Sequence, residues 1–308
     1  MQVKTSDHLN CLMLSEYAIR RQFEQSSEEA DSVYQEDSDP LLERQHEVVP
    51  GLIHKYSNRA LALMTAECAA YCRFCTRRRM LSDIESGNID TDSIDRWVWY
   101  LRQNSQVREV ILSGGDPFIV PDELFIYALE NLSAISTIKV IRIGTRAPVA
   151  DPILINRNKL AAIEKIDKPV YVGIHFEHPA ELTERTIGSI KALRKAGAIL
   201  YSQSVFLKDI NDDYDTLYKL FTGLLEVGVR PYYIYRCDKI PGAAHFLADF
   251  DKERYIMTKL RANLSGLACP FYIIDAPHGS GKIPVPLSFW DADTSHYSDF
   301  EGKEHIIE

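Results

Sequence analysis

The sequence lacks any long hydrophobic run. No window approaches the ~20 consecutive apolar residues that span a bilayer, and the N-terminal residues contain no apolar signal core. Positive charge is also scarce, because 35 Lys and Arg residues face 44 Asp and Glu residues, a formal net charge of −9. Nucleic acids and membrane surfaces are polyanionic, so neither is an expected partner. We therefore expect a cytoplasmic globular protein.

Cysteine is rare and unevenly placed. Three of the six cysteines, Cys68, Cys72 and Cys75, lie within eight residues, whereas the other three are scattered. This is not the even spacing of a disulfide framework, and it favours metal binding or catalysis in a reducing compartment. Internal repeats and low-complexity tracts are also missing. One wide domain with a small extension and two domains are both compatible with 308 residues.

Short β-type runs alternate with longer amphipathic runs from about residue 60. The expected strands lie at 60–65, 109–112, 139–143, 170–175, 199–206 and 230–235. The expected helices lie at 92–103, 122–132, 154–163, 181–195, 213–227 and 251–264. This alternation predicts an α/β fold with βαβ crossovers, a parallel sheet and chemistry at the carboxyl ends of the strands. Six units are too few for a closed eight-fold barrel, which leaves a partial barrel or an open doubly wound sheet.

The chain before this alternation has a different character. Residues 12–23 have helical apolar spacing, and residues 24–47 hold nine acids against one base, Arg44. We expect a small helical cap followed by a solvated acidic segment. Three segments are thus predicted, at 1–58, 59–265 and 266–308.

The three clustered cysteines lie just after the first expected strand. Thiolates spaced four and three residues apart suit a tight loop around an iron–sulfur cluster. A structural zinc site would be closed by four ligands, and no fourth Cys or His is near. Buried structural thiols are the plainer alternative, but the loop is polar and lies at a strand end. The arginines at 73 and 77–79 are expected to balance cluster charge or to bind carboxylate or phosphate.

The Cys-x3-Cys-x2-Cys spacing resembles the radical S-adenosylmethionine (SAM) signature, and residues 71–79 are similar to lysine 2,3-aminomutases. Motif similarity extends from about 39 to 286. The resemblance implies a partial (βα)6 TIM-type barrel with a short N-terminal helical extension and a C-terminal segment that binds pyridoxal phosphate (PLP). It implies a [4Fe–4S] cluster on Cys68, Cys72 and Cys75, with SAM bound to the open iron and cleaved to a 5′-deoxyadenosyl radical.

A glycine-rich turn follows the second expected strand. Gly114 and Gly115 would let the backbone approach a ligand, and the Asp116 carboxylate can accept from an ammonium group. Alone this stretch would be an ordinary turn. The resemblance makes it the loop for the SAM amino group, and it places His175 and Gln203 close to SAM.

Lys282 lies in a Gly- and Ser-rich loop beside prolines. An exposed, movable lysine suits a Schiff base that must later release the cofactor, although a surface lysine is the plainer alternative. The resemblance makes Lys282 the residue that carries PLP. By the same resemblance, Arg59 contacts the PLP phosphate, with Tyr56 and Lys55 in the same stretch. The family commonly has arginine where Lys55 stands, so a point charge replaces a planar fork.

Two carboxylates indicate the substrate. Asp238 and Asp275 match family positions that hold the distal ammonium group of lysine, and two carboxylates in one pocket repel unless a cation joins them. The resemblance also assigns Arg77 to the α-carboxylate of the substrate. We expect Tyr235 to contact the substrate as well. Lysine is favoured, with arginine, ornithine or glutamate as alternatives.

The implied activity is an isomerase that moves the α-amino group of L-lysine to its β-carbon through a PLP aldimine and a 5′-deoxyadenosyl radical. The resemblance extends to the branch of the family that makes β-lysine for the modification of elongation factor P. Residues 242–246 are similar to the corresponding stretch of that branch. A non-mutase radical SAM/PLP enzyme and an iron–sulfur sensor are the rivals.

Partners of several kinds are expected. They are a small amino-acid substrate, a one-electron reductant of the flavodoxin or ferredoxin type, and further copies of the chain in a homo-oligomer. Full-length relatives bind a structural zinc with C-terminal cysteines. Residues 283–308 hold none, and Asp213 stands near the partner position, so no such zinc is predicted.

Overall fold

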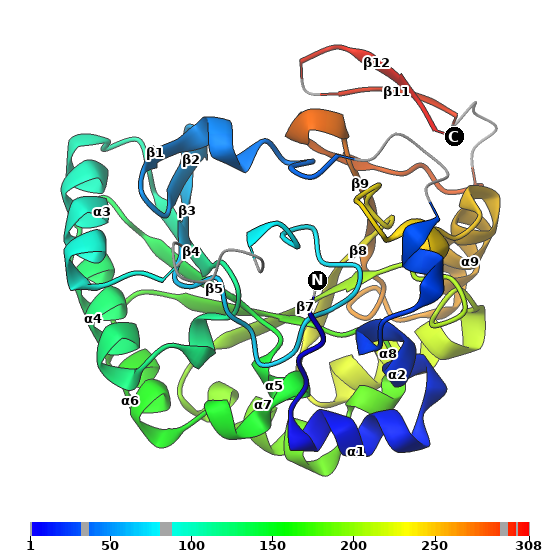
Figure 1. Ribbon diagram of the computed structural model, residues 1–308, viewed down its shortest axis with the longest axis horizontal. Helices are drawn as coiled ribbons and strands as arrows, with labels where there is room; N and C mark the ends of the chain where they lie inside the picture. The colour runs from blue at the N-terminus through cyan, green and yellow to red at the C-terminus, as the bar shows by residue number, and fades with distance from the viewer. Residues whose placement is uncertain (1, 32–36, 81–87, 290–294, 300, 308) are drawn as a thin grey trace.

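A computed structural model describes residues 2–31, 37–80, 88–289, 295–299 and 301–307 (Figure 1). Its main feature is a ten-stranded sheet in which the strands follow one another in chain order, from β1 to β10. The first two strands of the sheet, β1 (Glu47–Val49) and β2 (Leu52–Tyr56), pair in antiparallel fashion, and β2 is also antiparallel to the next strand. Within the described ranges no pairing joins β1 to β10, so the sheet is open.

The central part of the sheet is parallel. It contains β3 (Arg59–Leu63), β4 (Glu109–Ser113), β5 (Val140–Thr145), β6 (Val170–His175), β7 (Ile199–Val205), β8 (Arg230–Tyr235) and β9 (Phe271–Asp275). A short antiparallel strand, β10 (Lys282–Pro284), completes the edge beside β9. The predicted α/β fold with a mostly parallel, open sheet is therefore confirmed.

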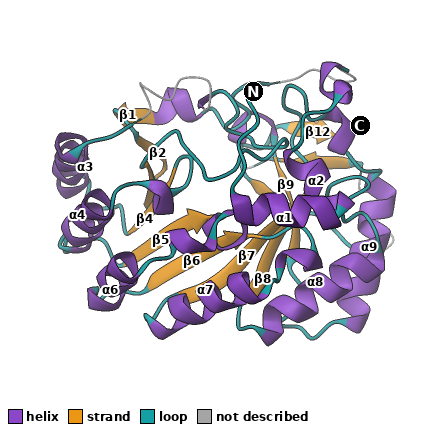
Figure 2. Cartoon of the chain, turned by 60° about the horizontal axis from the view of Figure 1, so that its bottom comes forward, coloured by secondary structure: helices purple, strands orange, loops and turns teal. Residues whose placement is uncertain are grey.

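Helices cover the outer face of the parallel strands (Figure 2). They are α3 (Thr91–Gln103), α4 (Asp122–Ser133), α5 (Ala147–Ala150), α6 (Arg157–Lys165), α7 (Glu184–Lys195), α8 (Tyr214–Glu226) and α9 (Phe250–Asn263). Side-chain N-caps start several of them, as when the Asp213 carboxylate accepts from the Thr216 N–H at 2.9 Å. The core lies between this layer and the sheet, where Trp97, Phe125 and Phe221 are fully buried.

The inner face of the sheet is more polar than its outer face. Arg142 from β5 forms an ion pair with Glu109 at 3.0 Å and donates to the Tyr201 hydroxyl at 2.9 Å. The Tyr232 hydroxyl donates to that of Tyr233 at 2.8 Å, and the two rings stack. These long side chains occupy the inner face of the sheet before the strands reach their carboxyl ends. Ligand binding and catalysis are therefore expected at the carboxyl-terminal edge of the sheet.

Two expectations for the C-terminal part were wrong. A seventh parallel strand, β9, lies in the segment that was expected only to bind PLP, and its apolar run Phe271–Asp275 buries three residues. Lys282 begins β10 and pairs with Asp275, so it does not lie in a free loop. The sheet thus crosses both predicted segment boundaries, at 58/59 and 265/266.

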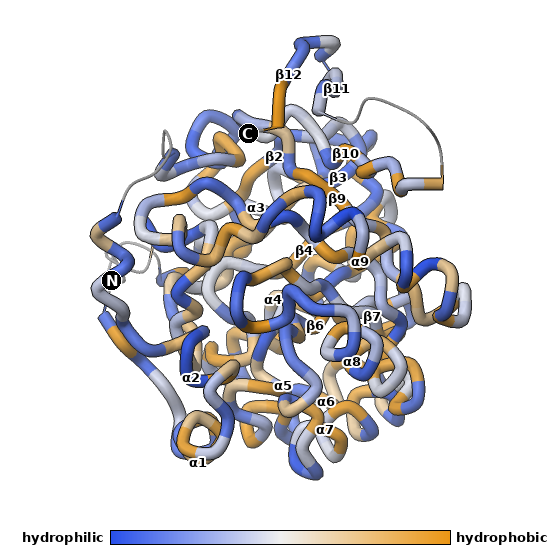
Figure 3. Tube along the Cα trace, turned by 90° about the vertical axis from the view of Figure 1, so that its right-hand side faces the viewer, coloured by the Kyte–Doolittle hydropathy of each residue, from blue (hydrophilic) through white to orange (hydrophobic). Residues whose placement is uncertain are grey.

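The N-terminal part also differs from expectation. One helix was predicted at 12–23, but the chain forms α1 (Asp7–Ser15) and α2 (Tyr17–Phe23), because Ser6 caps an earlier start. Leu9, Ile19 and Phe23 pack on Ala70 of the cysteine loop. At the other end of the chain, β11 (His296–Ser298) and β12 (Glu304–Ile306) form a hairpin that projects from the body (Figure 3).

Candidate active site

The cysteine loop and the glycine-rich turn form one unit at the ends of β3 and β4. The Gly115 N–H donates to the Thr65 carbonyl at 2.6 Å, and the Asp116 N–H donates to the Glu67 carbonyl at 2.7 Å. A Cβ on Gly115 would lie 1.9 Å from the Glu67 carbonyl oxygen, and Gly114 has a φ of +113°. Both glycines are therefore required by the close contact of two backbone segments.

The three thiols of this loop are costly to ionise without a partner. Burial raises the pKa of Cys68 well above its ordinary value and that of Cys72 to about 11, and it also raises the pKa of Cys75. Arg146 opposes this effect at Cys72, and Arg77 opposes it at Cys75. Cationic compensation of this kind fits thiolates that bind a metal centre.

The donor set also fits a cluster better than a single ion. In the part of the chain that the structure describes, no three His, Cys, Asp or Glu side chains converge on one metal position. In a [4Fe–4S] cluster each thiolate binds a different iron, so three separated thiols in one loop suffice. Cys68, Cys72 and Cys75 influence one another electrostatically and are therefore neighbours.

The arginines of this loop bind carboxylates of the chain itself. Arg77 holds Glu43 bidentately, with Nη2–Oε1 and Nε–Oε2 distances of 2.7 and 3.1 Å. The Glu29 carboxylate accepts from Arg73 at 2.7 Å and from Arg78 at 2.8 Å. Arg79 donates to Asp39 at 2.7 Å and to Glu43 at 3.3 Å.

Two described residues of the acidic segment are thus largely buried, and for them the expectation of a solvated segment was wrong; residues 32–36 lie outside the described residues. The side chains of Glu29 and Glu43 are only 10% and 7% exposed. Sequence reasoning missed both partners, although an acid-rich stretch upstream of an arginine run was a signal of charge complementarity. Arg77, predicted to bind the substrate α-carboxylate, already carries a carboxylate here.

Asp116 is buried and its carboxylate is fully engaged. Its oxygens accept from the Thr145 hydroxyl at 2.8 and 2.9 Å, from the Arg146 N–H at 2.8 Å and from the Phe118 N–H at 3.0 Å. These bonds join the turn after β4 to the end of β5. Burial raises its pKa, and the same donors oppose that rise. The hydrogen bonds of the Asp116 carboxylate hold the turn after β4 in place. Its contact with an ammonium group stays a prediction.

A second group of predicted residues meets at the ends of β7 to β10. The Lys282 ammonium donates to the two Asp275 oxygens at 2.7 and 2.8 Å and lies 4.6 Å from the centroid of the Tyr235 ring. Gln203 donates to the Tyr235 hydroxyl at 2.8 Å. Residues as far as 79 positions apart in the chain are thus brought into one inward-facing cluster by neighbouring strands.

Asp238 belongs to the same group. Burial and then the Asp275 carboxylate raise the pKa of Asp238 to about 7, and the Lys282 ammonium opposes this rise. No hydrogen-bond partner of the Asp238 carboxylate occurs in the described ranges. Among the described residues, Lys282 is the cation that pairs directly with Asp275, and Lys55 acts on Asp275 only from a greater distance. The Asp238 carboxylate has no directly paired cation in this part of the chain, so the two carboxylates are short of direct cationic partners.

The remaining predicted residues flank this cluster. His175 is the register partner of Gln203, and its Nδ1 lies 3.6 Å from Glu177 Oε1. Lys55 Nζ donates to the Leu41 carbonyl at 3.1 Å and to the His278 carbonyl, in the turn before Lys282, at 3.4 Å. Burial lowers the pKa of Lys55.

Arg59 and Tyr56 form a stacked pair. The Arg59 guanidinium lies 3.7 Å from the centroid of the Tyr56 ring, and its Nη1 donates to Asn58 at 3.1 Å. The pair closes the β2–β3 turn, where Tyr56 and Arg59 are register partners. Its guanidinium carries no carboxylate among the described contacts, so it is available to an anion.

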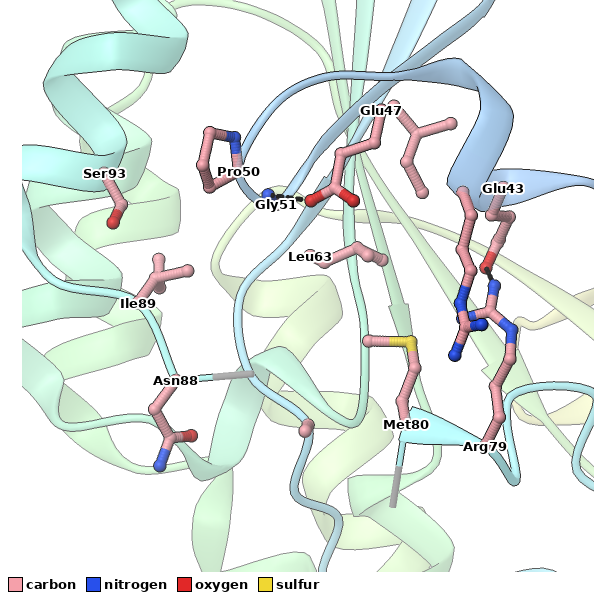
Figure 4. Close-up of a pocket in the computed structure, with 13 residues that line it drawn as sticks. Glu43, Glu47, Pro50, Gly51, Leu63, Arg79, Met80, Asn88, Ile89 and Ser93 are labelled. Atoms are coloured by element: carbon pink, nitrogen blue, oxygen red, sulfur yellow. Dashed lines mark hydrogen bonds and ion pairs between the residues drawn. The ribbon is translucent and has the colours of Figure 1, made fainter. Parts of the chain in front are cut away.

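A cavity of about 280 Å³ lies beside this site, between the β2–β3 edge and α3 (Figure 4). Glu43 and Arg79 form one wall, and Ile89 and Ser93 form part of the opposite wall. None of the predicted site residues lines it, so its connection to the site is the Glu43 carboxylate shared with Arg77.

Neither α3 nor any other helix in the described ranges is both long and apolar enough to cross a bilayer.

Solved structures with the same fold include Streptococcus suis SuiB bound to S-adenosylmethionine. It is 14% identical, with a TM-score of 0.52, and the match covers 77% of this chain and 53% of that one. A radical SAM methyltransferase from Sphaerobacter thermophilus matches with a TM-score of 0.53 and 14% identity, over 74% of this chain and 69% of that one. At this identity the likeness concerns the fold alone.

Sequence relatives are much more similar. An L-lysine 2,3-aminomutase of Acetoanaerobium sticklandii is 40% identical over 87% of this chain and 64% of its own length. The Escherichia coli L-lysine 2,3-aminomutase is 36% identical over 81% of this chain and 72% of its own length. A glutamate 2,3-aminomutase of Clostridioides difficile is also 36% identical, over 82% of this chain and 59% of its own length.

The chain spans about three fifths of the length of the first curated relatives it matches. The Radical SAM superfamily model matches residues 63–221, which hold the cysteine loop and most of the parallel strands. The chain therefore belongs to the lysine 2,3-aminomutase family of the radical SAM superfamily, a family of isomerases that implies a [4Fe–4S] cluster, SAM and PLP as cofactors.

Proposed function

We propose that the chain moves the α-amino group of L-lysine to its β-carbon. The observation that carries this proposal is the shortage of positive charge around Asp238 and Asp275. Among the described residues, the two carboxylates have one directly paired ammonium group, Lys282, and burial followed by repulsion from Asp275 raises the pKa of Asp238. A substrate with a cationic tail supplies the missing charge, whereas the carboxylate tail of glutamate would add to the repulsion.

The proposed roles of the residues follow from their places. Cys68, Cys72 and Cys75 hold the cluster, and the Gly114–Gly115–Asp116 turn, His175 and Gln203 face SAM. Lys282 binds PLP, with Arg59, Tyr56 and Lys55 toward its phosphate. When bound, the cluster with SAM supplies a radical that removes a hydrogen atom, and PLP supplies a carrier for the migrating amino group.

The work left to the chain's own residues is binding and exclusion of water. Asp238 and Asp275 would hold the distal ammonium group, and Tyr235, at the end of β8, would border the pocket. Lys282 must leave Asp275 to reach a cofactor, which frees that carboxylate for the substrate. Arg77 would receive the α-carboxylate. Because Glu43 occupies its Nε–Nη2 edge and its Nη1 donates to the Ser113 hydroxyl at 3.2 Å, the substrate would have to share or displace one of these partners.

The proposal also includes a cytoplasmic location, a one-electron reductant of the flavodoxin or ferredoxin type, and a homo-oligomeric state. Its support is the charge pattern described above together with relatives that are named L-lysine 2,3-aminomutases.

The test is anaerobic reconstitution with iron, sulfide, PLP, SAM and a chemical reductant, followed by product analysis. L-Lysine, L-arginine, L-ornithine and L-glutamate are offered separately, and products are identified by mass spectrometry and chiral chromatography. We expect β-lysine from L-lysine and no rearranged product from L-glutamate. A β-amino acid from L-glutamate alone would contradict the proposal, as would SAM cleavage without rearrangement of any of the four.

A further inference from the structure

One buried arginine outside the predicted site contacts the cysteine loop. Arg146 directly follows β5, and its side chain is only 10% exposed. Its Nη1 donates to the sulfur of Cys72 at 2.7 Å. Its backbone N–H donates to Asp116 Oδ2 at 2.8 Å. One residue thus connects the middle cysteine with the glycine-rich turn after β4.

The guanidinium of Arg146 is held on its other edge by two fully buried side chains. Nη2 donates to Glu181 Oε1 at 3.0 Å and also to Gln22 Oε1. Gln22 in turn donates to Glu181 Oε1 at 3.1 Å. Gln22 belongs to α2 and Glu181 to the segment after β6, so two distant parts of the chain fix the orientation of one guanidinium.

Aromatic rings shield this arrangement from water. The guanidinium lies 4.6 Å from the ring centroid of Phe23 and 5.6 Å from that of Phe74, which stands between Cys72 and Cys75. A charge in such a low-dielectric setting acts strongly on a neighbouring sulfur. Hydrogen bonds to ligand sulfur and nearby positive charge favour the more negative, reduced state of an iron–sulfur cluster.

We propose that Arg146 is a positioning residue for the cluster, whose N–H···S bond to Cys72 raises the cluster's reduction potential. In this role an external one-electron donor reduces the cluster, and the added negative charge is stabilised by the Arg146 guanidinium. The N-terminal helix α2 belongs to the redox site because its Gln22 orients that guanidinium. The inference rests on the assignment of Cys72 as a cluster ligand in the proposed function, and it is independent of the substrate.

The same loop offers a matched control. Arg78 is shielded to a similar degree, at 15% exposure, but its guanidinium donates to the Arg73 and Gly242 carbonyls at 2.7 and 3.1 Å and to Glu29. Among the described residues it makes no hydrogen bond to a cysteine sulfur. Removing either arginine deletes one cation near the loop, but only one of the two deletions removes a bond to sulfur.

The experiment compares R146K and R146M with R78K and R78M in the reconstituted full chain. Iron and sulfide contents and thermal unfolding establish loading and folding. The midpoint potential of the cluster is then measured by a reductive titration followed by electron paramagnetic resonance. We expect R146M to weaken reduction about tenfold, a shift of about 59 mV to more negative potential. R146K should shift in the same direction by less, and each Arg78 variant should shift less than its Arg146 counterpart.

The outcomes separate this inference from the proposed function. A wild-type chain that binds no cluster would overturn the assignment of Cys72, and the inference with it. A loaded wild type with unchanged potential in both Arg146 variants would overturn the inference alone, as would equal shifts in the Arg78 variants. If R146M does not retain iron, the comparison of R146K with R78K decides, since lysine keeps the charge but not the fork.

Discussion

Two regions of the site treat charge in opposite ways. In the cysteine loop, Arg73, Arg77, Arg78 and Arg79 meet the carboxylates of Glu29, Asp39 and Glu43, all from the N-terminal segment. Around Lys282, the Asp238 and Asp275 carboxylates share one ammonium group. In the first region every arginine has a carboxylate partner within the chain, whereas in the second the Asp238 carboxylate has no directly paired cation among the described residues.

This difference separates what is structural from what awaits a ligand. Buried ion pairs that are complete hold segments together, because removal of one member leaves a charge of the other without its counterion. An incomplete set of charges instead favours a ligand that completes it. Four experiments on the two regions can test this contrast.

Removal of the one ammonium group in the second region should abolish activity. In K282A, β-lysine formation should fall to background because PLP has no lysine to bind, while iron content stays at the wild-type level. Product analysis and the visible absorbance of lysine-bound PLP measure the two effects. K165A removes an exposed lysine on the outer helices and should behave as wild type. Normal turnover of K282A would refute the assignment of PLP to Lys282.

Removal of one carboxylate should weaken lysine binding specifically. In D238N the KM for L-lysine should rise about 100-fold, or about 2.7 kcal/mol, because a buried charge partner of the substrate ammonium is lost. Steady-state kinetics measure this effect. D212N removes a carboxylate that binds the exposed Lys252 and should leave the KM unchanged. Equal KM values for D238N and wild type would show that the Asp238 carboxylate does not bind the distal ammonium group of the substrate.

Removal of a carboxylate from the balanced region should affect folding. E29Q takes away the acceptor shared by Arg73 and Arg78, so the free energy of unfolding should fall by about 3 kcal/mol. E28Q is the adjacent control: its partner is Arg21, its own side chain is 44% exposed, and its loss should cost under about 1 kcal/mol. Denaturant unfolding measures both. Equal losses would show that the buried pairs of this loop contribute no more than surface pairs.

The smallest expected effect is a pH dependence. The pKa of Asp238 is raised to about 7, so the carboxyl is mostly neutral below that pH and mostly ionised above it. The kcat/KM for L-lysine should therefore rise about tenfold between about pH 6 and pH 8. D238N should lack this rise. Burial also raises the pKa of Glu253 to about 7, and a profile unchanged in D238N would assign the titration to that group.

Much of the fold was predictable because its signals are local. The apolar runs of β3 to β8 and the amphipathic helices between them were predicted close to their observed bounds. β9 was not predicted, although its sequence, Phe271–Asp275, is as apolar as that of the other strands. The start of α1 was missed because Ser6 caps it before the apolar spacing becomes clear.

The contacts within the site could not be predicted from the sequence. Periodicity gives no partner for a charge, so the bonds of Glu43 to Arg77 and of Arg146 to Cys72 had no sequence signal beyond charge balance. The roles assigned to Asp116 and Lys282 stay predictions. The observed bonds of Asp116 to Thr145 and of Lys282 to Asp275 were not foreseen.

The α/β class, the cysteine spacing and the residue types of the site are evident from the sequence, because they depend on neighbours a few positions apart. Which charges are paired within the chain is evident only from the folded structure. Those pairs join residues 34 to 49 positions apart around the cysteine loop, and their formation depends on how the N-terminal segment packs over the ends of the strands. In the folded chain each arginine of the loop has a carboxylate partner, and the Asp238 carboxylate has no hydrogen-bond partner among the described residues.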